Sequence, residues 1–330
     1  MGLFAQAVET RSRYGVYVME VFTAICQRPP VLLDKEASMA VALAAVAEAA
    51  SKGARLITFP EAFLPGYPTW IWRLRPGGDM ALGNEIHSQL QRNAINIGSG
   101  DLDPLREAAA QHGMVMVMGM HELDAEFSGS TLFNTVVVIG DDGTILNRHR
   151  KLMPTNPERM VWGAGDASGL RVVDTKFGRL GCLLCWENYM PLARYALYAQ
   201  HMDILVAVTW DCGDLWTASM RHIAKEGGCW VISSATALQG SDIPLSFPGR
   251  GQLFKDEEWI NPGDAIAVKP GGSLLAGPLH EKKSILYVTI DAEMARASRK
   301  SLDPTGHYSR SDVFQLNVDR RQKPPAIFQE

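Results

Sequence analysis

The sequence predicts an α/β fold in which a mixed sheet is covered by helices. Apolar, β-branched segments of strand length alternate along the chain with segments that favour helix. Some neighbouring strand segments are separated only by short turns that contain glycine, which is typical of antiparallel hairpins. Such a pattern forms sheets with helices packed outside them. No low-complexity linker divides the 330 residues, so we expect one domain over 1–330 with a short tail from about residue 315.

Signals for the start and the end of helices mark the elements of the first half. Asp34 is expected to cap a helix that Gly53 ends, and Asp103 to cap another that Gly113 ends. Asp-Asp-Gly at 141–143 predicts a hairpin turn between two strands. We expect strands at 14–25, 54–59, 114–119, 132–140 and 144–149, helices at 34–51, 81–96 and 103–112, and an aromatic loop at 62–72.

The second half is organised around the stretch 171–191. Two strands joined at Lys-Phe-Gly (176–178) form a hairpin, the second strand ends at Cys185, and Pro191 stands where a helix begins. Asp291 is expected to cap a last short helix. We expect strands at 171–175, 179–185, 203–209, 230–235 and 284–290, and helices at 191–199, 217–226 and 291–301.

Composition excludes several classes of function. The chain is 46% hydrophobic and 21% charged, and its net charge of −4 with no basic block argues against a nucleic-acid partner. Five widely spread cysteines suit a reducing compartment rather than a disulfide framework. We find no signal peptide and no apolar run long enough to span a bilayer, so a cytoplasmic protein without a membrane partner is expected.

Cys185 is the candidate nucleophile, because a strand-to-helix turn exposes unpaired amides that favour a thiolate. A buried cysteine can also be inert core. With Cys182 it forms a C-x-x-C, which opens a redox or zinc alternative. No second C-x-x-C or close histidine pair follows to complete a zinc site. Within a strand, residues three apart point to opposite faces, which disfavours a redox pair.

Glu61 and Lys151, like Cys185, each follow a predicted strand. Ligands of α/β proteins collect beyond the carboxyl ends of strands, so a carboxylate, an ammonium and a thiol could meet there. Most such charged residues simply face solvent. Here, however, Glu61 lies between Phe-Pro and Phe-Leu sequences, and Lys151 precedes Leu-Met-Pro.

These stretches resemble the nitrilase superfamily of carbon–nitrogen hydrolases, whose triad is Glu, Lys and Cys. The resemblance runs from about residue 16 to about residue 314, and its Cys-Trp-Glu-Asn segment is typical of the true nitrilase branch. It implies a four-layer α-β-β-α sandwich, a homodimer, and assembly into larger spirals or filaments. The matching segments are 59–63, 149–155 and 185–191, with Asn134, Glu158, Arg159, Trp162, Gly165 and 220–227 in support.

The resemblance also implies the chemistry. Lys151 would lower the pKa of the Cys185 thiol and, with the backbone amide of Trp186, stabilise the negative nitrogen that forms on attack. Glu61 would be the general base, and water would release the acid from a thioester. Glu158 would orient Lys151 or the water, or form only a structural salt bridge.

An aromatic pocket and no cofactor or metal are expected. The pocket residues flank the triad segments and suit an uncharged nitrile, although each could instead be core or subunit interface. They are Tyr67, Trp162, Trp186, Tyr189 and Trp210.

Several rival functions stay open. An amidase or an amide-releasing activity is the alternative within the class, while a cyanide-converting relative is disfavoured because Asn188 stands where such proteins often carry His. A thiol redox protein using Cys182 and Cys185, or a non-catalytic binding module of the same fold, are the alternatives from other classes. The sequence does not indicate which nitrile is preferred.

Overall fold

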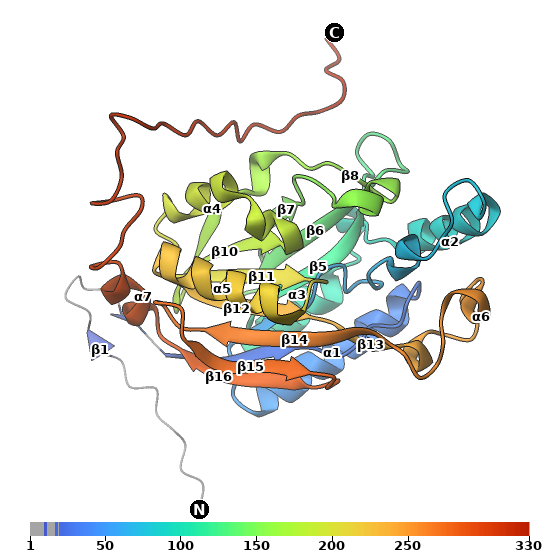
Figure 1. The fold of residues 1–330 in the computed structure, drawn as a ribbon, viewed down its shortest axis with the longest axis horizontal. Coiled ribbons are helices and arrows are strands. Elements are labelled where there is room, and N and C mark those ends of the chain that lie inside the picture. The colour runs from blue at the N-terminus through green and yellow to red at the C-terminus, as the bar shows by residue number, and fades with distance from the viewer. Residues whose placement is uncertain (1–9, 12–16, 19, 330) are drawn as a thin grey trace, which may run out of the picture.

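Two seven-stranded sheets pack face to face, and helices cover their outer faces (Figure 1). A computed structural model describes residues 10, 11, 17, 18 and 20–329. One apolar cluster fills the space between the sheets, with Ile25 and Val117 from the first sheet and Val206 and Ile232 from the second. The four α-β-β-α layers expected from the resemblance are therefore confirmed.

The first sheet has its parallel strands at the centre. Strands β3, β4 and β5 run parallel, whereas β5, β6 and β7 form an antiparallel meander and β16 lies antiparallel to β3. In spatial order the strands are β16 (Ile285–Ile290), β3 (Val21–Cys26), β4 (Leu56–Thr58), β5 (Val115–Leu123), β6 (Leu132–Ile139) and β7 (Ile145–Arg150), with β8 (Trp162–Gly163) beside β6.

The second sheet repeats this plan. Strands β10, β11 and β12 are parallel, and β9 and β14 flank them antiparallel. In spatial order the strands are β13 (Ala237–Gln239), β14 (Trp259–Val268), β12 (Trp230–Ala235), β11 (Ile204–Thr209), β10 (Gly178–Leu184) and β9 (Val172–Thr175), with β15 (Leu274–His280) paired to β14. A two-stranded ladder joins β1 (Thr10–Arg11) to β2 (Tyr17–Val18).

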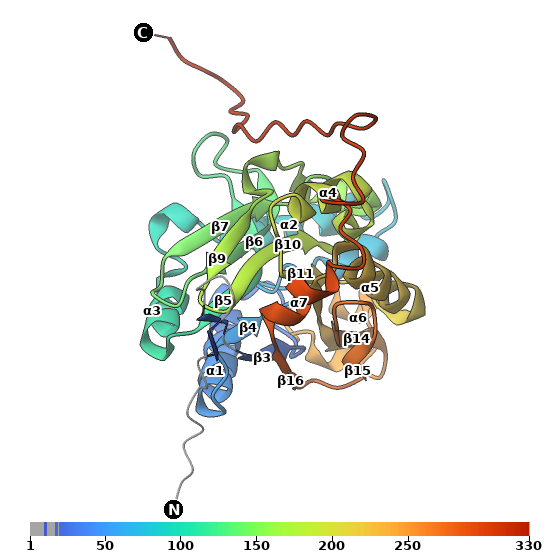
Figure 2. The same cartoon turned by 90° about the vertical axis from the view of Figure 1, so that its left-hand side faces the viewer.

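The helices form the two outer layers (Figure 2). Helices α1 (Lys35–Ser51) and α3 (Asp103–His112) pack on the first sheet, and α4 (Pro191–Tyr198) and α5 (Gly213–Gly227) on the second. The remaining helices are α2 (Met80–Asn93), α6 (Arg250–Leu253) and α7 (Ala292–Ser298), and the 3₁₀ turns are η1 (Thr69–Trp72), η2 (Ile97–Ser99), η3 (Asn156–Met160), η4 (Ala167–Gly169), η5 (Cys185–Tyr189) and η6 (Gly240–Asp242). Among the residues described, no helix is both long and apolar enough to cross a bilayer.

The capping signals were mostly reliable. Asp34 accepts a hydrogen bond from the amide of Ala37, and Asp291 caps α7 in the same way. Pro191 opens α4, as predicted. The prediction for α3 was wrong by one residue, because Leu102 is its N-cap and Asp103 lies inside its first turn.

Other boundaries differ from the predictions. Helix α5 begins at Gly213 rather than at 217, and α2 ends at Asn93 rather than at 96. Strands β14 and β15 were not predicted, because each contains a glycine and a proline, residues that are depleted in strands. Of the strand predicted at 14–25, residues 14–16 and 19 lie outside the described part of the chain.

Candidate active site

Three strand ends bring a carboxylate, an ammonium and a thiol together. Glu61 follows β4 and Lys151 follows β7 of the first sheet, whereas Cys185 follows β10 of the second. The Lys151 Nζ atom lies 2.8 Å from Glu61 Oε1 and 2.7 Å from Glu158 Oε2. The charges of Glu61, Lys151 and Glu158 all act on the pKa of the Cys185 thiol, which is buried. The predicted carboxylate, ammonium and thiol therefore come from strand ends of both sheets.

Glu61 is held by donors on both oxygens. Its Oε1 accepts from Asn134 Nδ2 at 2.7 Å and from Lys151 Nζ, and its Oε2 accepts from the backbone amide of Trp210 at 2.9 Å. Burial raises the pKa of Glu61 and the Glu158 charge adds to the rise, while Lys151 and the hydrogen bonds oppose it. A raised carboxylate pKa favours proton uptake, which suits a general base.

Lys151 is a buried ammonium between two carboxylates. Burial alone would lower its pKa, but attraction to the Glu61 and Glu158 carboxylates raises the pKa above that of an ordinary lysine. The group therefore stays charged at neutral pH. An ammonium carries three N–H donors, so one donor remains beyond the bonds to Glu61 and Glu158.

Cys185 sits in a backbone conformation that side chains rarely adopt. Its φ is +48°, in the left-handed region, and it is the first residue of η5. Burial raises the pKa of its thiol, Glu61 adds to the rise and Lys151 opposes it. Lys151 thus acts in the expected direction, but burial and Glu61 outweigh it. The resting sulfur is a thiol that must lose its proton during attack.

Glu158 forms hydrogen bonds with both Lys151 and Tyr67. Its Oε2 accepts from Lys151 Nζ and from the backbone amide of Thr155 at 2.7 Å, within a capping box of η3. Its Oε1 accepts from the Tyr67 hydroxyl at 2.7 Å. Glu158 thus contacts Lys151 directly, as one of its predicted roles requires.

The predicted aromatic pocket residues fall into two groups. Tyr67 stacks on Trp210 with ring centroids 4.3 Å apart and meets the edge of Trp162 at 5.8 Å. The other two lie nearer the surface, where Trp186 Nε1 donates to an Asp211 carboxylate oxygen at 2.9 Å and the Tyr189 hydroxyl donates to the same oxygen at 3.3 Å. Trp186 is 47% exposed. The first group contacts the candidate catalytic carboxylates, because Tyr67 bonds Glu158 and the Trp210 amide bonds Glu61.

Sequence reasoning did not find the buried polar contacts around the candidate catalytic residues. Asn134 was known only from the resemblance, and the bond from its amide to Glu61 joins β6 to the turn after β4, which no local pattern reveals. Glu187 and His149 lay in matching segments without an assigned role, yet their side chains pair in the buried interior at 3.1 Å.

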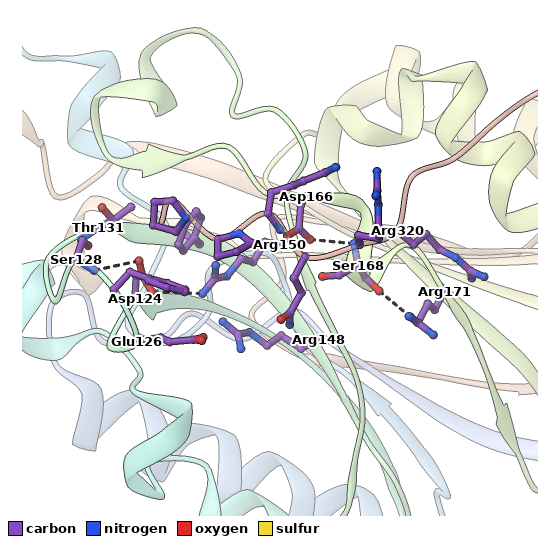
Figure 3. Close-up of a pocket in the computed structure, with 17 residues that line it drawn as sticks. Asp124, Glu126, Ser128, Thr131, Arg148, Arg150, Asp166, Ser168, Arg171 and Arg320 are labelled. Carbon is purple, nitrogen blue, oxygen red and sulfur yellow. Dashed lines mark hydrogen bonds and ion pairs between the residues drawn. The ribbon is translucent and has the colours of Figure 1, made fainter. Parts of the chain in front are cut away.

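A large cavity lies elsewhere, and none of the predicted site residues line it (Figure 3). Its volume is about 980 Å³, and the C-terminal segment 320–325 forms part of its wall. Arg148 and Arg150 on this wall both pair with the buried carboxylate of Glu122. The cavity is therefore separate from the triad.

The chain is similar to known proteins in both sequence and fold. The family described as carbon–nitrogen hydrolase matches residues 22–300. Over 314 residues the chain is 37% identical to a bifunctional nitrilase/nitrile hydratase of Lupinus angustifolius, covering 93% of this chain and 88% of that one. It is also 37% identical over 305 residues to an aliphatic nitrilase of Sinorhizobium fredii, covering 92% and 97%. The C. elegans NitFhit protein shares the fold, with a TM-score of 0.71 at 20% identity over 93% of this chain and 69% of that one.

Proposed function

Because this chain belongs to the carbon–nitrogen hydrolase family, we propose that it is a nitrilase that converts an organic nitrile and water to the carboxylic acid and ammonia. The observation that supports this most directly is the Lys151 ammonium held between Glu61 and Glu158 beside the Cys185 thiol. An acid, an amine and a sulfur in this arrangement can attack a carbon–nitrogen multiple bond and manage the protons that follow.

In the first step, Glu61 takes the proton of Cys185 as the sulfur attacks the nitrile carbon. A C–S bond forms, one C–N π bond breaks, and its electron pair moves to nitrogen. The remaining donor of Lys151 and the backbone amide of Trp186 stabilise that nitrogen. Glu61 then gives up its proton to nitrogen, which yields a neutral thioimidate bound to Cys185.

Two molecules of water complete the reaction. Glu61 deprotonates the first water as it adds to the thioimidate carbon, and proton transfer to nitrogen lets ammonia leave, which gives a thioester. The second water, again deprotonated by Glu61, attacks the thioester and releases the carboxylic acid and the thiol. Collapse of the first tetrahedral intermediate with loss of the sulfur instead of ammonia would release the amide. A relative named for nitrile hydratase activity as well makes this the second product to measure.

Glu158 and the aromatic side chains support these steps. Glu158 fixes the Lys151 ammonium through a direct bond and is itself fixed by Tyr67. Tyr67, Trp162 and Trp210 would form the inner wall of the substrate pocket, and Trp186 and Tyr189 its outer part. Such a wall suits an uncharged substrate.

Assembly and location complete the proposal. We infer one domain over 1–330, with a tail from about 315, that works in the cytoplasm as a homodimer and assembles into larger spirals or filaments. Leu192 on α4 and Leu215 on α5 are 66% and 76% exposed, and a subunit interface would cover such side chains. Gel filtration and electron microscopy of the purified chain test the assembly.

The test of function is an ammonia assay over aliphatic, arylaceto and aromatic nitriles and their amides. We expect release from at least one nitrile class, no release by Cys185→Ala, and a substrate adduct on Cys185 in the mass spectrum of the parent protein. Ammonia release by Cys185→Ala at the parent rate would overturn the proposal. A thiol redox function would instead require Cys182, which is buried in the cluster between the sheets.

A further inference from the structure

Glu187 is a buried carboxylate that the proposed chemistry does not use. Its Oε2 accepts from the backbone amide of Leu184 at 2.8 Å, and its Oε1 accepts from that of Leu152 at 2.6 Å. The Nε2 atom of His149 lies 3.1 Å from both oxygens. We propose that Glu187 is a positioning residue, which holds the segments that carry Cys185 and Lys151 in register through their main-chain amides.

The two amides belong to the immediate neighbours of the proposed catalytic groups. Leu184 precedes Cys185 at the end of β10, and Leu152 follows Lys151 at the end of β7. These strands lie in different sheets, so one carboxylate joins the two layers at the point where the thiol and the ammonium meet. A buried link between two layers at this point restricts how far the sulfur and the amine can drift apart.

The backbone at Cys185 needs such support. A positive φ at a residue other than glycine persists only where the surroundings fix it. The Glu187 bond fixes the amide of Leu184 on one side, and Asn188 Nδ2 donates to the Cys185 carbonyl at 2.8 Å on the other. Both supports come from the same five-residue turn, η5.

The role of Glu187 is geometric. Its pKa is lowered, because His149 and the two amides outweigh the effect of burial, so the side chain is an ionised acceptor. Besides burial, the strongest influences on the pKa of the Cys185 thiol are Glu61, Lys151 and Glu158. The placement of two acceptor oxygens, rather than the charge alone, should therefore decide the effect of a substitution. Glu187→Asp keeps the charge but is one methylene too short to serve both amides. Glu187→Gln keeps the length but turns an NH₂ donor towards at least one of them.

The experiment measures the alkylation rate of Cys185 by iodoacetamide, the kcat and KM for the best nitrile, and the melting temperature, on folded protein checked by circular dichroism. The control is Asp203→Asn. Asp203 is an equally buried carboxylate that accepts from the backbone amide of Arg179 at 3.1 Å and pairs with Arg296 and Arg299, but it lies before the start of β11, at the opposite end from the triad.

We expect Glu187→Gln and Glu187→Asp to lower kcat on the order of 10²-fold with little change in KM, because small misplacements of catalytic groups have effects of this size. Iodoacetamide should also alkylate Cys185 more slowly in both variants. Asp203→Asn should lower the melting temperature to a similar extent and keep both rates. If Glu187→Gln does not fold, Glu187→Asp is the decisive variant. Parent-like rates in a folded Glu187 variant, or an equal loss in Asp203→Asn, would overturn the inference. The kcat arm rests on the proposed function. The alkylation measurement does not depend on that function. A parent protein without nitrilase activity would therefore refute the proposed function, while the alkylation rates would still test the role of Glu187.

Discussion

Replacing Glu61 by Gln should change two properties of the site in opposite directions. Glu61 is the proposed base, so its loss should slow nitrile turnover by about 10²- to 10⁴-fold. The same carboxylate is, after burial, the largest cause that raises the pKa of the Cys185 thiol. Removing its charge lowers that pKa, and at a pH below the pKa a lower value means more thiolate. The Cys185 sulfur of Glu61→Gln should therefore react faster with a simple alkylating agent.

The size of each effect follows from the contacts. A nearby like charge shifts a pKa by about a unit or more. The lower basicity of the thiolate offsets part of the gain, so we expect alkylation of Cys185 to be about 3- to 10-fold faster. The three donors on Glu61, from Asn134, Lys151 and the Trp210 amide, occupy both oxygens. The NH₂ of Gln must face at least one of them, which costs about 1–3 kcal/mol of folding free energy.

The assay is a pair of measurements on the same preparation. Ammonia release gives turnover, and incorporation of iodoacetamide, located by mass spectrometry, gives the reactivity of Cys185 at several pH values near neutrality. Cys185→Ala supplies the blank for both. A Glu61→Gln variant that is slower in alkylation as well as in turnover would refute the assignment of Glu61 as a group that keeps the resting thiol protonated.

Three further outcomes are expected. Cys182→Ser should keep hydrolysis while losing about 1–3 kcal/mol of stability, because its hydroxyl enters the apolar cluster between the sheets; loss of ammonia release by stable protein would contradict this. Tyr67→Phe removes the bond to Glu158 Oε1 and should cost about 0.5–1.5 kcal/mol in thermal melting and slow turnover, whereas parent kcat would show that this bond plays no part. Because burial raises the pKa of Glu61, kcat/KM should fall with decreasing pH at a point above the ordinary glutamate value of about 4.3, and an acid limb at or below that value would be inconsistent with Glu61 as the base.

Local signals in the sequence were enough to place the proposed nucleophile. The hairpin before Cys185, the proline that opens α4 and the caps at Asp34 and Asp291 all depend on neighbours in the chain, and the structure confirms each of them. The position of Cys185 directly after β10 follows from the hairpin and from Pro191 alone.

Contacts between distant segments could not be read in the same way. Periodicity indicates strands but does not assign them to one sheet or two, so only the resemblance suggested the four layers. Tyr67 stays a predicted pocket residue, but the bond from its hydroxyl to Glu158 is a contact that no local pattern indicates. One of the two amides that bond the Glu187 carboxylate, that of Leu152, is far away in the chain, and this partner appears only once the ends of β7 and β10 are brought together.

The proposed base and amine are carried by one layer of the sandwich, and the sulfur is carried by the other. Catalysis would then depend on how the two halves are docked, a property that neither half possesses by itself. Mild heat or denaturant that moves one sheet relative to the other would inactivate the enzyme while each sheet keeps its own hydrogen bonds. Efforts to make the protein durable should accordingly begin with the apolar side chains between the sheets, before the caps of the outer helices.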